Sequence, residues 1–167
     1  MPWLFIAVVV AAWILLFSGT GQADGGNVSG NVPSAVLQWT SLAQQYANYY
    51  SILDPEEILA IIWQESSGNP SAVNPNDPSY GLMQVTALIA HAYGGYDSAD
   101  TSWRTYPEKN IKAGAGFLAY LKNKYSSDYP NWVAAYNEGE TNLLRGGLDQ
   151  GYVDRFNANL AALKGTV

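Results

Sequence analysis

The sequence predicts a mainly α-helical domain that is preceded by an N-terminal hydrophobic helix. Apolar residues recur at helical spacing in six segments between residues 34 and 163, and no segment shows the regular alternation of a half-buried strand. Residues 3–17 are uninterrupted apolar sequence. With 167 residues, 48% of them hydrophobic and only 13% charged, the chain is long and apolar enough for one domain with its own core.

The apolar run at residues 3–17 predicts a membrane segment over residues 1–17. As a helix the run would span roughly 22 Å, less than the roughly 30 Å hydrocarbon core of a bilayer. Met1 and Pro2 lack the basic charge of a usual signal peptide, whereas residues 21–23 have the small-x-small pattern of a cleavage site. A short anchor is therefore favoured over a cleaved export signal, and a buried core helix is the third alternative.

Residues 18–33 are rich in glycine and predict a flexible tether, so that the folded domain covers residues 34–167. The net charge is −6, and all eight Lys and Arg residues lie from Arg104 onward without forming a basic run. Because phosphate neutralisation needs clustered basic residues, no nucleic-acid partner is expected. The absence of cysteine excludes disulfides and cysteine-based catalysis.

Two helices are expected in the first part of the domain. The helix over residues 34–50 carries an apolar stripe on one face. The helix over residues 54–65 has a well-specified start, with Asp54 as N-cap, Pro55 at the first position and Glu57 completing a capping box. The residues of the stripe are Val36, Trp39, Leu42, Ala43 and Tyr46.

Four further helices are expected over residues 84–94, 107–125, 131–139 and 150–163. The one over 107–125 begins with Pro107, whose fixed φ angle suits a first turn. Its core-facing residues recur at helical spacing and are Ile111, Ala115, Leu118 and Leu121. Together with the first two, these segments make the domain mainly α-helical.

Glu65 ends an apolar helix on the side that should be buried. It follows three isoleucines of that helix by seven, four and three residues, so it shares their face, and Gly68 is the expected C-cap. Burial beside aliphatic groups and the negative end of the helix dipole both disfavour the ionised carboxylate. A raised pKa suits a general acid, but a solvated glutamate in a fraying last turn remains the alternative. The three isoleucines are Ile58, Ile61 and Ile62.

Four sequence blocks, in order, resemble the soluble lytic transglycosylase family, which carries the transglycosylase SLT domain and belongs to the lysozyme-like superfamily. They are "QES" with the following "NPSAVNPNDPSYGLMQV", "NIKAGAGFLAYL" (110–121), "VAAYNEG" (133–139) and "GYVDRF" (151–156). The resemblance covers about residues 55–156. It implies a lysozyme-like domain of the goose-type or SLT-like kind, with short helices around a glycan cleft.

The resemblance also implies a role for particular residues. Glu65 corresponds to the catalytic acid and base, and Ser66 supports it. For Met83, core packing is as well founded as contact with the sugar, and for Tyr136 the alternative is a buried ring with a bonded hydroxyl. The substrate-binding residues that the resemblance implies are Ser66, Tyr80, Met83, Gln84, Tyr136, Asn137 and Tyr152.

A single catalytic carboxylate is implied. Where animal-type lysozymes carry a second acid before the equivalent glycine, this chain has Ser79, and Asp77 is interpreted as a loop residue. The family's chemistry is then expected: Glu65 protonates the β-1,4 oxygen between N-acetylmuramic acid (MurNAc) and N-acetylglucosamine (GlcNAc). It next deprotonates the muramic C6 hydroxyl to give a 1,6-anhydro product. A lysozyme-type hydrolase and a catalytically dead, membrane-tethered glycan-binding module remain alternatives.

Other chemistry has little support in the sequence. His91 is the sole histidine and is interpreted as an ordinary helix residue. Asp97 and Asp100 are interpreted as part of a polar loop, with a weak cation site as the alternative. No metal or cofactor is expected. The expected partners are peptidoglycan strands and, through residues 3–17, a membrane, with a monomeric catalytic domain. The architecture fits a bacterial envelope enzyme on the periplasmic or cell-wall side. It also fits a protein of the phage virion that opens the wall during infection.

Overall fold

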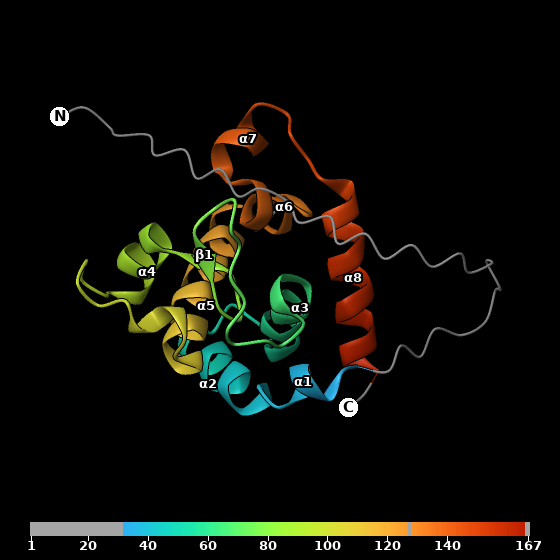
Figure 1. Cartoon of the computed structure of the whole chain (residues 1–167). Helices are drawn as coiled ribbons and strands as arrows, with labels where there is room; N and C mark the ends of the chain where they lie inside the picture. Colours follow the sequence, from blue (N-terminus) through green and yellow to red (C-terminus); the bar gives the residue numbers. More distant parts are fainter. Residues whose placement is uncertain (1–31, 127, 166–167) are drawn as a thin grey trace.

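The structure, a computed structural model, describes residues 32–126 and 128–165. Within this part the mainly α-helical architecture is confirmed (Figure 1). The predicted membrane segment (1–17) and nearly all of the predicted tether (18–31) lie outside the described residues. None of the helices in the described ranges has the length and apolar character needed to cross a bilayer.

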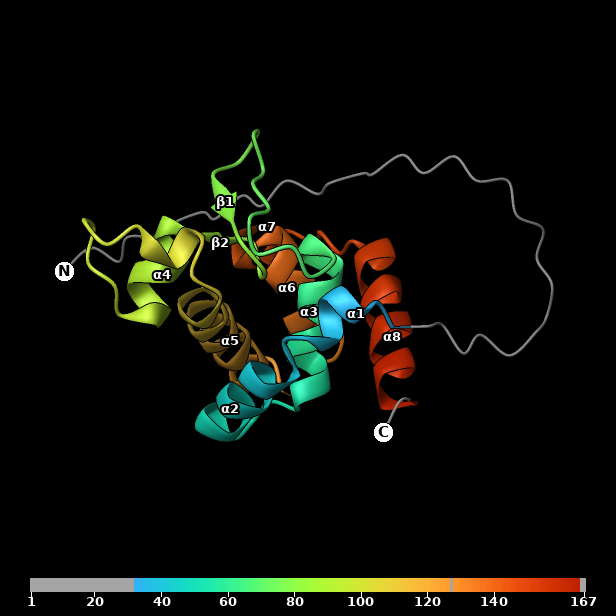
Figure 2. The same cartoon turned by 60° about the horizontal axis from the view of Figure 1, so that its bottom comes forward.

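Helix α3 occupies the middle of the helical array, between α5 on one side and α8 on the other (Figure 1). Figure 2 shows that the C-terminal end of α3, the first turn of α8 and a short hairpin all lie on the same side of the molecule. The helices have these bounds: α1 Ser34–Leu37, α2 Thr40–Tyr50, α3 Pro55–Ser66, α4 Ala87–Gly94, η1 Ser102–Arg104, α5 Pro107–Lys124, α6 Asn131–Glu138, α7 Glu140–Leu144 and α8 Gln150–Lys164.

The prediction of a single helix over residues 34–50 is wrong in one respect. The helix is interrupted at Trp39, so that α1 and α2 are separate. The indole Nε1 of Trp39 donates a hydrogen bond to the carbonyl oxygen of Gly68 at 3.0 Å. This contact brings α1 against the chain that leaves α3, and a Cβ on Gly68 would lie only 2.1 Å from the Ala35 carbonyl oxygen. A long-range contact therefore overrides a continuous helical pattern.

The start of α3 is confirmed as predicted, whereas its end differs by one residue. Glu57 accepts a hydrogen bond from the backbone N–H of Asp54 at 2.9 Å, and Pro55 opens the helix. The C-cap is Ser67, in the left-handed region at φ 53°, and Gly68 at φ 83° follows it. The isoleucines of the apolar face are fully buried, as expected for Ile58, Ile61 and Ile62.

The hairpin corrects the prediction that no strand is present and that a helix begins at residue 84. Strands β1 (Ser79–Tyr80) and β2 (Val85–Thr86) pair in antiparallel fashion, and α4 starts only after them, with Thr86 as N-cap. The reason is Gln84, whose φ of 46° cannot belong to a helix. Two other short elements, η1 and α7, also lack a sequence prediction.

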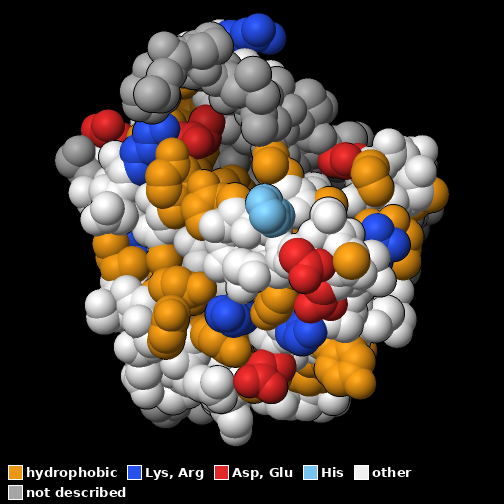
Figure 3. All heavy atoms as spheres, turned by 90° about the vertical axis from the view of Figure 1, so that its left-hand side faces the viewer, with side chains coloured by type: hydrophobic (Ala, Val, Ile, Leu, Met, Phe, Trp, Pro, Cys, Tyr) orange, Lys and Arg blue, Asp and Glu red, His pale blue; other side chains and the backbone are white. Residues whose placement is uncertain are grey.

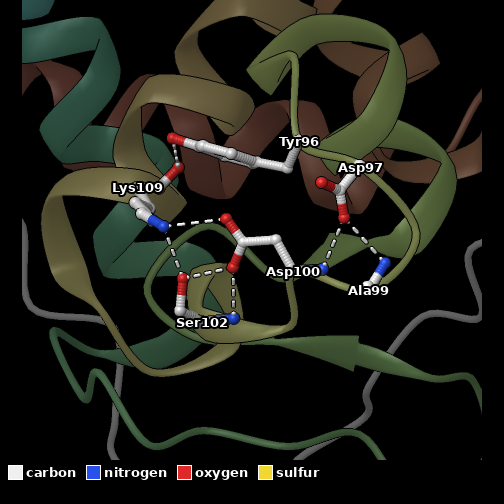
Figure 4. A network of polar contacts seen from close by, with 6 residues as sticks. All are labelled: Tyr96, Asp97, Ala99, Asp100, Ser102 and Lys109. Carbon is white, nitrogen blue, oxygen red and sulfur yellow. Dashed lines mark hydrogen bonds and ion pairs between the residues drawn. The ribbon is translucent and has the colours of Figure 1, made fainter.

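A polar network fixes the loop between α4 and α5 (Figure 4). Lys109, in the first turn of α5, donates to Asp100 at 2.8 Å and to the Ser102 hydroxyl at 2.6 Å. The bonds from Lys109 and Ser102 lower the pKa of Asp100 to about 2. Asp97 accepts from the backbone N–H groups of Ala99 and Asp100. Asp97 and Asp100 thus hold the loop between α4 and α5 in its conformation.

Candidate active site

Glu65 lies in the last turn of α3, facing the first turn of α8. The hydroxyl of Tyr152 donates a hydrogen bond to its Oε1 at 2.5 Å. One residue earlier, the Gln64 side-chain amide donates to the Tyr152 carbonyl oxygen at 3.0 Å. Two bonds therefore join the end of α3 to Tyr152, one to its backbone and one to its hydroxyl.

The surroundings of Glu65 favour its protonated form. Although the residue keeps partial solvent exposure, burial of its carboxyl group raises its pKa to about 7. The hydrogen bond from Tyr152 and the charge of Arg155 act in the opposite direction and lower it. Desolvation wins, so the carboxyl group titrates near neutral pH, where one group can both donate and accept a proton.

Tyr136 approaches the same carboxyl group from α6. Its hydroxyl donates to the backbone carbonyl oxygen of Met83 at 2.9 Å, and the ring is buried. Burial and the charge of Glu65 raise the pKa of Tyr136, and likewise that of Tyr152, well above the usual value. Both hydroxyls thus stay protonated around Glu65, and only that of Tyr152 is bonded to it.

Ser66 is bonded to backbone groups. Its hydroxyl lies 2.9 Å from the Leu82 carbonyl oxygen and 3.0 Å from that of Ile62, and it accepts from the N–H of Gly68 at 3.2 Å. Ser66 therefore ties the end of α3 to the loop that follows the hairpin's first strand, next to Glu65.

Gln84 and Ser79 close the hairpin through their side chains. The Ser79 hydroxyl donates to Gln84 Oε1 at 3.0 Å, and Gln84 Nε2 donates to the Gly81 and Ala72 carbonyl oxygens at 3.0 and 3.3 Å. Ser79, which stands where animal-type lysozymes carry a second acid, thus holds the side-chain amide of Gln84. Asp77 lies in the loop before β1, as interpreted from the sequence.

Asn110 is a site residue whose only signal in the sequence is its place at the start of the block "NIKAGAGFLAYL". Fully buried in α5, it accepts from the Met83 N–H at 2.9 Å and donates to the Tyr80 and Trp103 carbonyl oxygens at 2.8 and 3.0 Å. The Met83 side chain is buried against Gly114, where an added Cβ would come within 2.7 Å of it. Asn110 therefore attaches the hairpin to α5 in the core.

The two remaining predicted residues, Tyr80 and Asn137, differ in whether their side chains are free to bind a ligand. The Tyr80 ring packs edge-on against Trp103 and beneath the guanidinium of Arg104, whose carbon lies 4.7 Å from the ring centroid. Asn137 is 5% exposed, and its side chain has no hydrogen-bond partner within residues 32–126 and 128–165. An unpartnered amide next to Tyr136 is available to a ligand.

Two other expectations concern surface groups. His91 is exposed on α4, with its Nδ1 at 2.8 Å from the Tyr96 carbonyl oxygen, and serves as an ordinary helix residue. On the face shown in Figure 3, Lys and Arg side chains are interspersed with acidic and apolar ones and form no continuous basic patch.

Comparison with known proteins gives a consistent set of relatives. The family described as "Transglycosylase SLT domain" matches residues 41–158. Membrane-bound lytic murein transglycosylase C of Edwardsiella ictaluri is 33% identical over 120 residues, which cover 65% of this chain and 33% of that protein. Endo-type membrane-bound lytic murein transglycosylase A of Salmonella paratyphi B is 35% identical over 92 residues, covering 52% and 44%. This chain thus spans about a third to under a half of the curated relatives it matches.

Among solved structures, an X-ray structure of an inactive mutant of lytic transglycosylase Slt from Pseudomonas aeruginosa matches with a TM-score of 0.58. The match has 21% sequence identity and covers 74% of this chain and 22% of that one. It shows that the described part shares the fold of one portion of that larger protein.

Proposed function

This chain belongs to the transglycosylase SLT domain family, and we propose that it is a peptidoglycan lytic transglycosylase. It cleaves the β-1,4 bond between MurNAc and GlcNAc and leaves a 1,6-anhydro-MurNAc end. The observation that carries the proposal is the state of Glu65: a carboxyl group with a pKa near 7, bonded to one tyrosine hydroxyl. The names of the relatives support the same reaction class.

The proposed reaction uses Glu65 twice. Protonated Glu65 gives its proton to the glycosidic oxygen, the bond to the muramic C1 breaks, and the substrate's own 2-acetamido group stabilises the cationic centre. The Glu65 carboxylate then takes the proton of the muramic C6 hydroxyl, and that oxygen bonds to C1. No water is consumed, and Glu65 ends protonated as it began. The Tyr152 hydroxyl, which donates to Oε1, stabilises the carboxylate between the two steps.

The other site residues divide into those that contact the glycan and those that support the site. Asn137 binds a sugar hydroxyl or acetamido group, because its amide lacks a protein partner in the described part. Tyr136 forms the wall beside Glu65, and its hydroxyl is bonded to the backbone of Met83, whose own side chain packs in the core against Gly114. Ser66, Tyr80 and Gln84 border the glycan and hold the hairpin in place.

Membrane association is part of the proposal. It is supported by the apolar run at residues 3–17 and by relatives whose names describe them as membrane-bound. The catalytic domain then acts on the cell-wall side of a bacterial membrane. The alternative of a phage protein remains a prediction from the sequence.

The products test the reaction directly. The full chain is incubated with purified peptidoglycan, and the soluble products are analysed by mass spectrometry. We expect muropeptides with anhydro ends, each lighter by one water than the corresponding reducing-end product. Reducing-end muropeptides would contradict the lyase in favour of a hydrolase. Binding to peptidoglycan without soluble products would contradict both and leave the glycan-binding module.

The pH dependence of the rate tests the role of Glu65. Bond cleavage needs the protonated acid, whose pKa is about 7, so the rate should be high at pH 5 to 6 and fall about tenfold per pH unit above 7. The initial release of anhydromuropeptides is measured between pH 5 and 9 at fixed ionic strength. A rate that rises through pH 8 would exclude Glu65 as the acid.

A further inference from the structure

The first turn of α8, which presents Tyr152 to Glu65, receives an additional support from α6. Glu138 is the last residue of α6, and its Oε1 accepts a hydrogen bond from the backbone N–H of Asp149, eleven residues later. Asp149 is the N-cap of α8, and its carboxylate accepts from the Tyr152 N–H at 3.0 Å. A chain of hydrogen bonds therefore runs from Glu138 through Asp149 and Tyr152 to Glu65.

The segment between α6 and α8 is held at its start by Glu140, which bonds Lys124 and Tyr125 of α5 and its C-cap, whereas its end lies against Glu138. Helix α7 contains no buried residue, and Leu144 and Leu148 are 73% and 38% exposed. Gly147 lies against the Glu138 carboxylate so closely that an added Cβ would come within 2.6 Å of Oε2. The chain thus leaves α6 at Glu138, exposes Leu144 and Leu148 to solvent, and returns to the Glu138 carboxylate before α8 begins.

We infer that Glu138 is a positioning residue, which holds the N-cap of α8 so that the Tyr152 hydroxyl stays on Glu65. The inference rests on the proposed function for its importance in catalysis. Glu138 touches none of the reacting groups, and its effect reaches Glu65 through the bond that Tyr152 makes. Loss of Glu138 should therefore act as a partial loss of the Tyr152 hydroxyl.

The titration of Glu65 gives a readout that a merely structural role would leave unchanged. In the described part, the groups that act on it are Tyr152 and Arg155 from α8 and Tyr136 from α6. The bond from Tyr152 lowers the pKa of Glu65, so weakening this bond must move the titration to higher pH. The carboxyl carbon of Glu65 is followed by NMR in the full chain, with its signal assigned by its absence in Glu65→Gln.

We expect Glu138→Ala and Tyr152→Phe each to move the titration of Glu65 to higher pH, and Glu138→Ala to lower turnover by about tenfold to a hundredfold. When Glu138→Ala is combined with Tyr152→Phe, it should not shift the titration of Glu65 further, because the bond from the Tyr152 hydroxyl is already absent. Glu138→Gln, which keeps an acceptor oxygen, should titrate like the wild type. Glu140→Ala is the matched control: it removes a carboxylate from the same segment, one that bonds Tyr125 and Lys124 instead of α8, and should leave the titration unchanged.

Two milder variants cover the case in which Glu138→Ala does not fold. Glu138→Asp shortens the reach by one methylene. Gly147→Ala changes no charge, and its added Cβ would lie 2.6 Å from the Glu138 carboxylate and 2.9 Å from the Asn142 carbonyl oxygen, so the chain and the carboxylate must both shift. Both should move the titration in the same direction. An unchanged titration of Glu65 in the folded Glu138 variants, or a shift that adds fully to that of Tyr152→Phe, would overturn the inference. Because the titration needs no substrate, this result stands apart from whether the chain cleaves peptidoglycan.

Discussion

Replacing Glu65 with glutamine should abolish glycan cleavage and leave the protein folded. Glutamine has nearly the same shape, and its side-chain oxygen can still accept the hydrogen bond from Tyr152. It cannot give or take the proton that both steps of the reaction require. Since general acid–base catalysis contributes roughly 10²–10⁴-fold, the release of soluble muropeptides should fall by at least about a hundredfold.

The same substitution should make the protein more stable above neutral pH. Burial raises the pKa of Glu65 from 4.5 to about 7, so the folded state holds its proton more tightly than the unfolded chain. The stability that this contributes is present below about pH 4.5 and is lost as the pH rises to 7, by up to about 3 kcal/mol. Glutamine carries no such penalty. Urea unfolding should therefore show a gain for Glu65→Gln at pH 8 and almost none at pH 4.5.

Glu56→Gln is the control on the same helix. Glu56 lies in the first turn of α3, where a carboxylate is favoured by the helix dipole, so its loss should slightly destabilise the protein at pH 8. It should also leave cleavage intact. The role of Glu65 would be contradicted if Glu65→Gln cleaved the glycan at the wild-type rate. It would also be contradicted if Glu65→Gln and the wild type were equally stable at both pH 4.5 and pH 8.

The sequence predicts well those features that local rules determine. The start of α3 follows from Asp54, Pro55 and Glu57, which satisfy the first turn without help from elsewhere. The apolar spacing of α5 and α8 likewise predicts their extent to within about one residue. The position of Glu65 at the end of a buried helix follows from the same local periodicity.

The features that the sequence does not predict depend on contacts between distant residues. The break at Trp39 needs the Gly68 carbonyl, and the turn at Gln84 needs Ser79 and the buried Asn110 beneath it. The bond between Tyr152 and Glu65 joins residues that are 87 positions apart, so only the family resemblance pointed to Tyr152. The family resemblance assigns no role to Glu138, although it lies in the block "VAAYNEG", and only the folded structure shows its bond to Asp149.

Replacing Asn110 should destabilise the whole protein and release the hairpin that carries Gln84. Its side chain satisfies one buried N–H group and two carbonyl oxygens, which belong to Met83, Tyr80 and Trp103. In Asn110→Ala all three lose their partner, and each unsatisfied buried group costs about 1–3 kcal/mol. The free energy of unfolding in urea should fall by about 3–5 kcal/mol, which is a large share of the total for a domain of this size.

Asn110→Asp separates the acceptor from the donor role of this side chain. Aspartate can still accept from Met83, but when ionised it faces two carbonyl oxygens without a proton to offer. Its pKa should therefore be raised in the folded state, and the variant should be less destabilised at pH 4 than at pH 7. The exposed Asn123 on the same helix is the matched control, and Asn123→Ala should change the stability by less than about 0.5 kcal/mol. A loss for Asn110→Ala as small as this control's would show that the hairpin does not depend on Asn110.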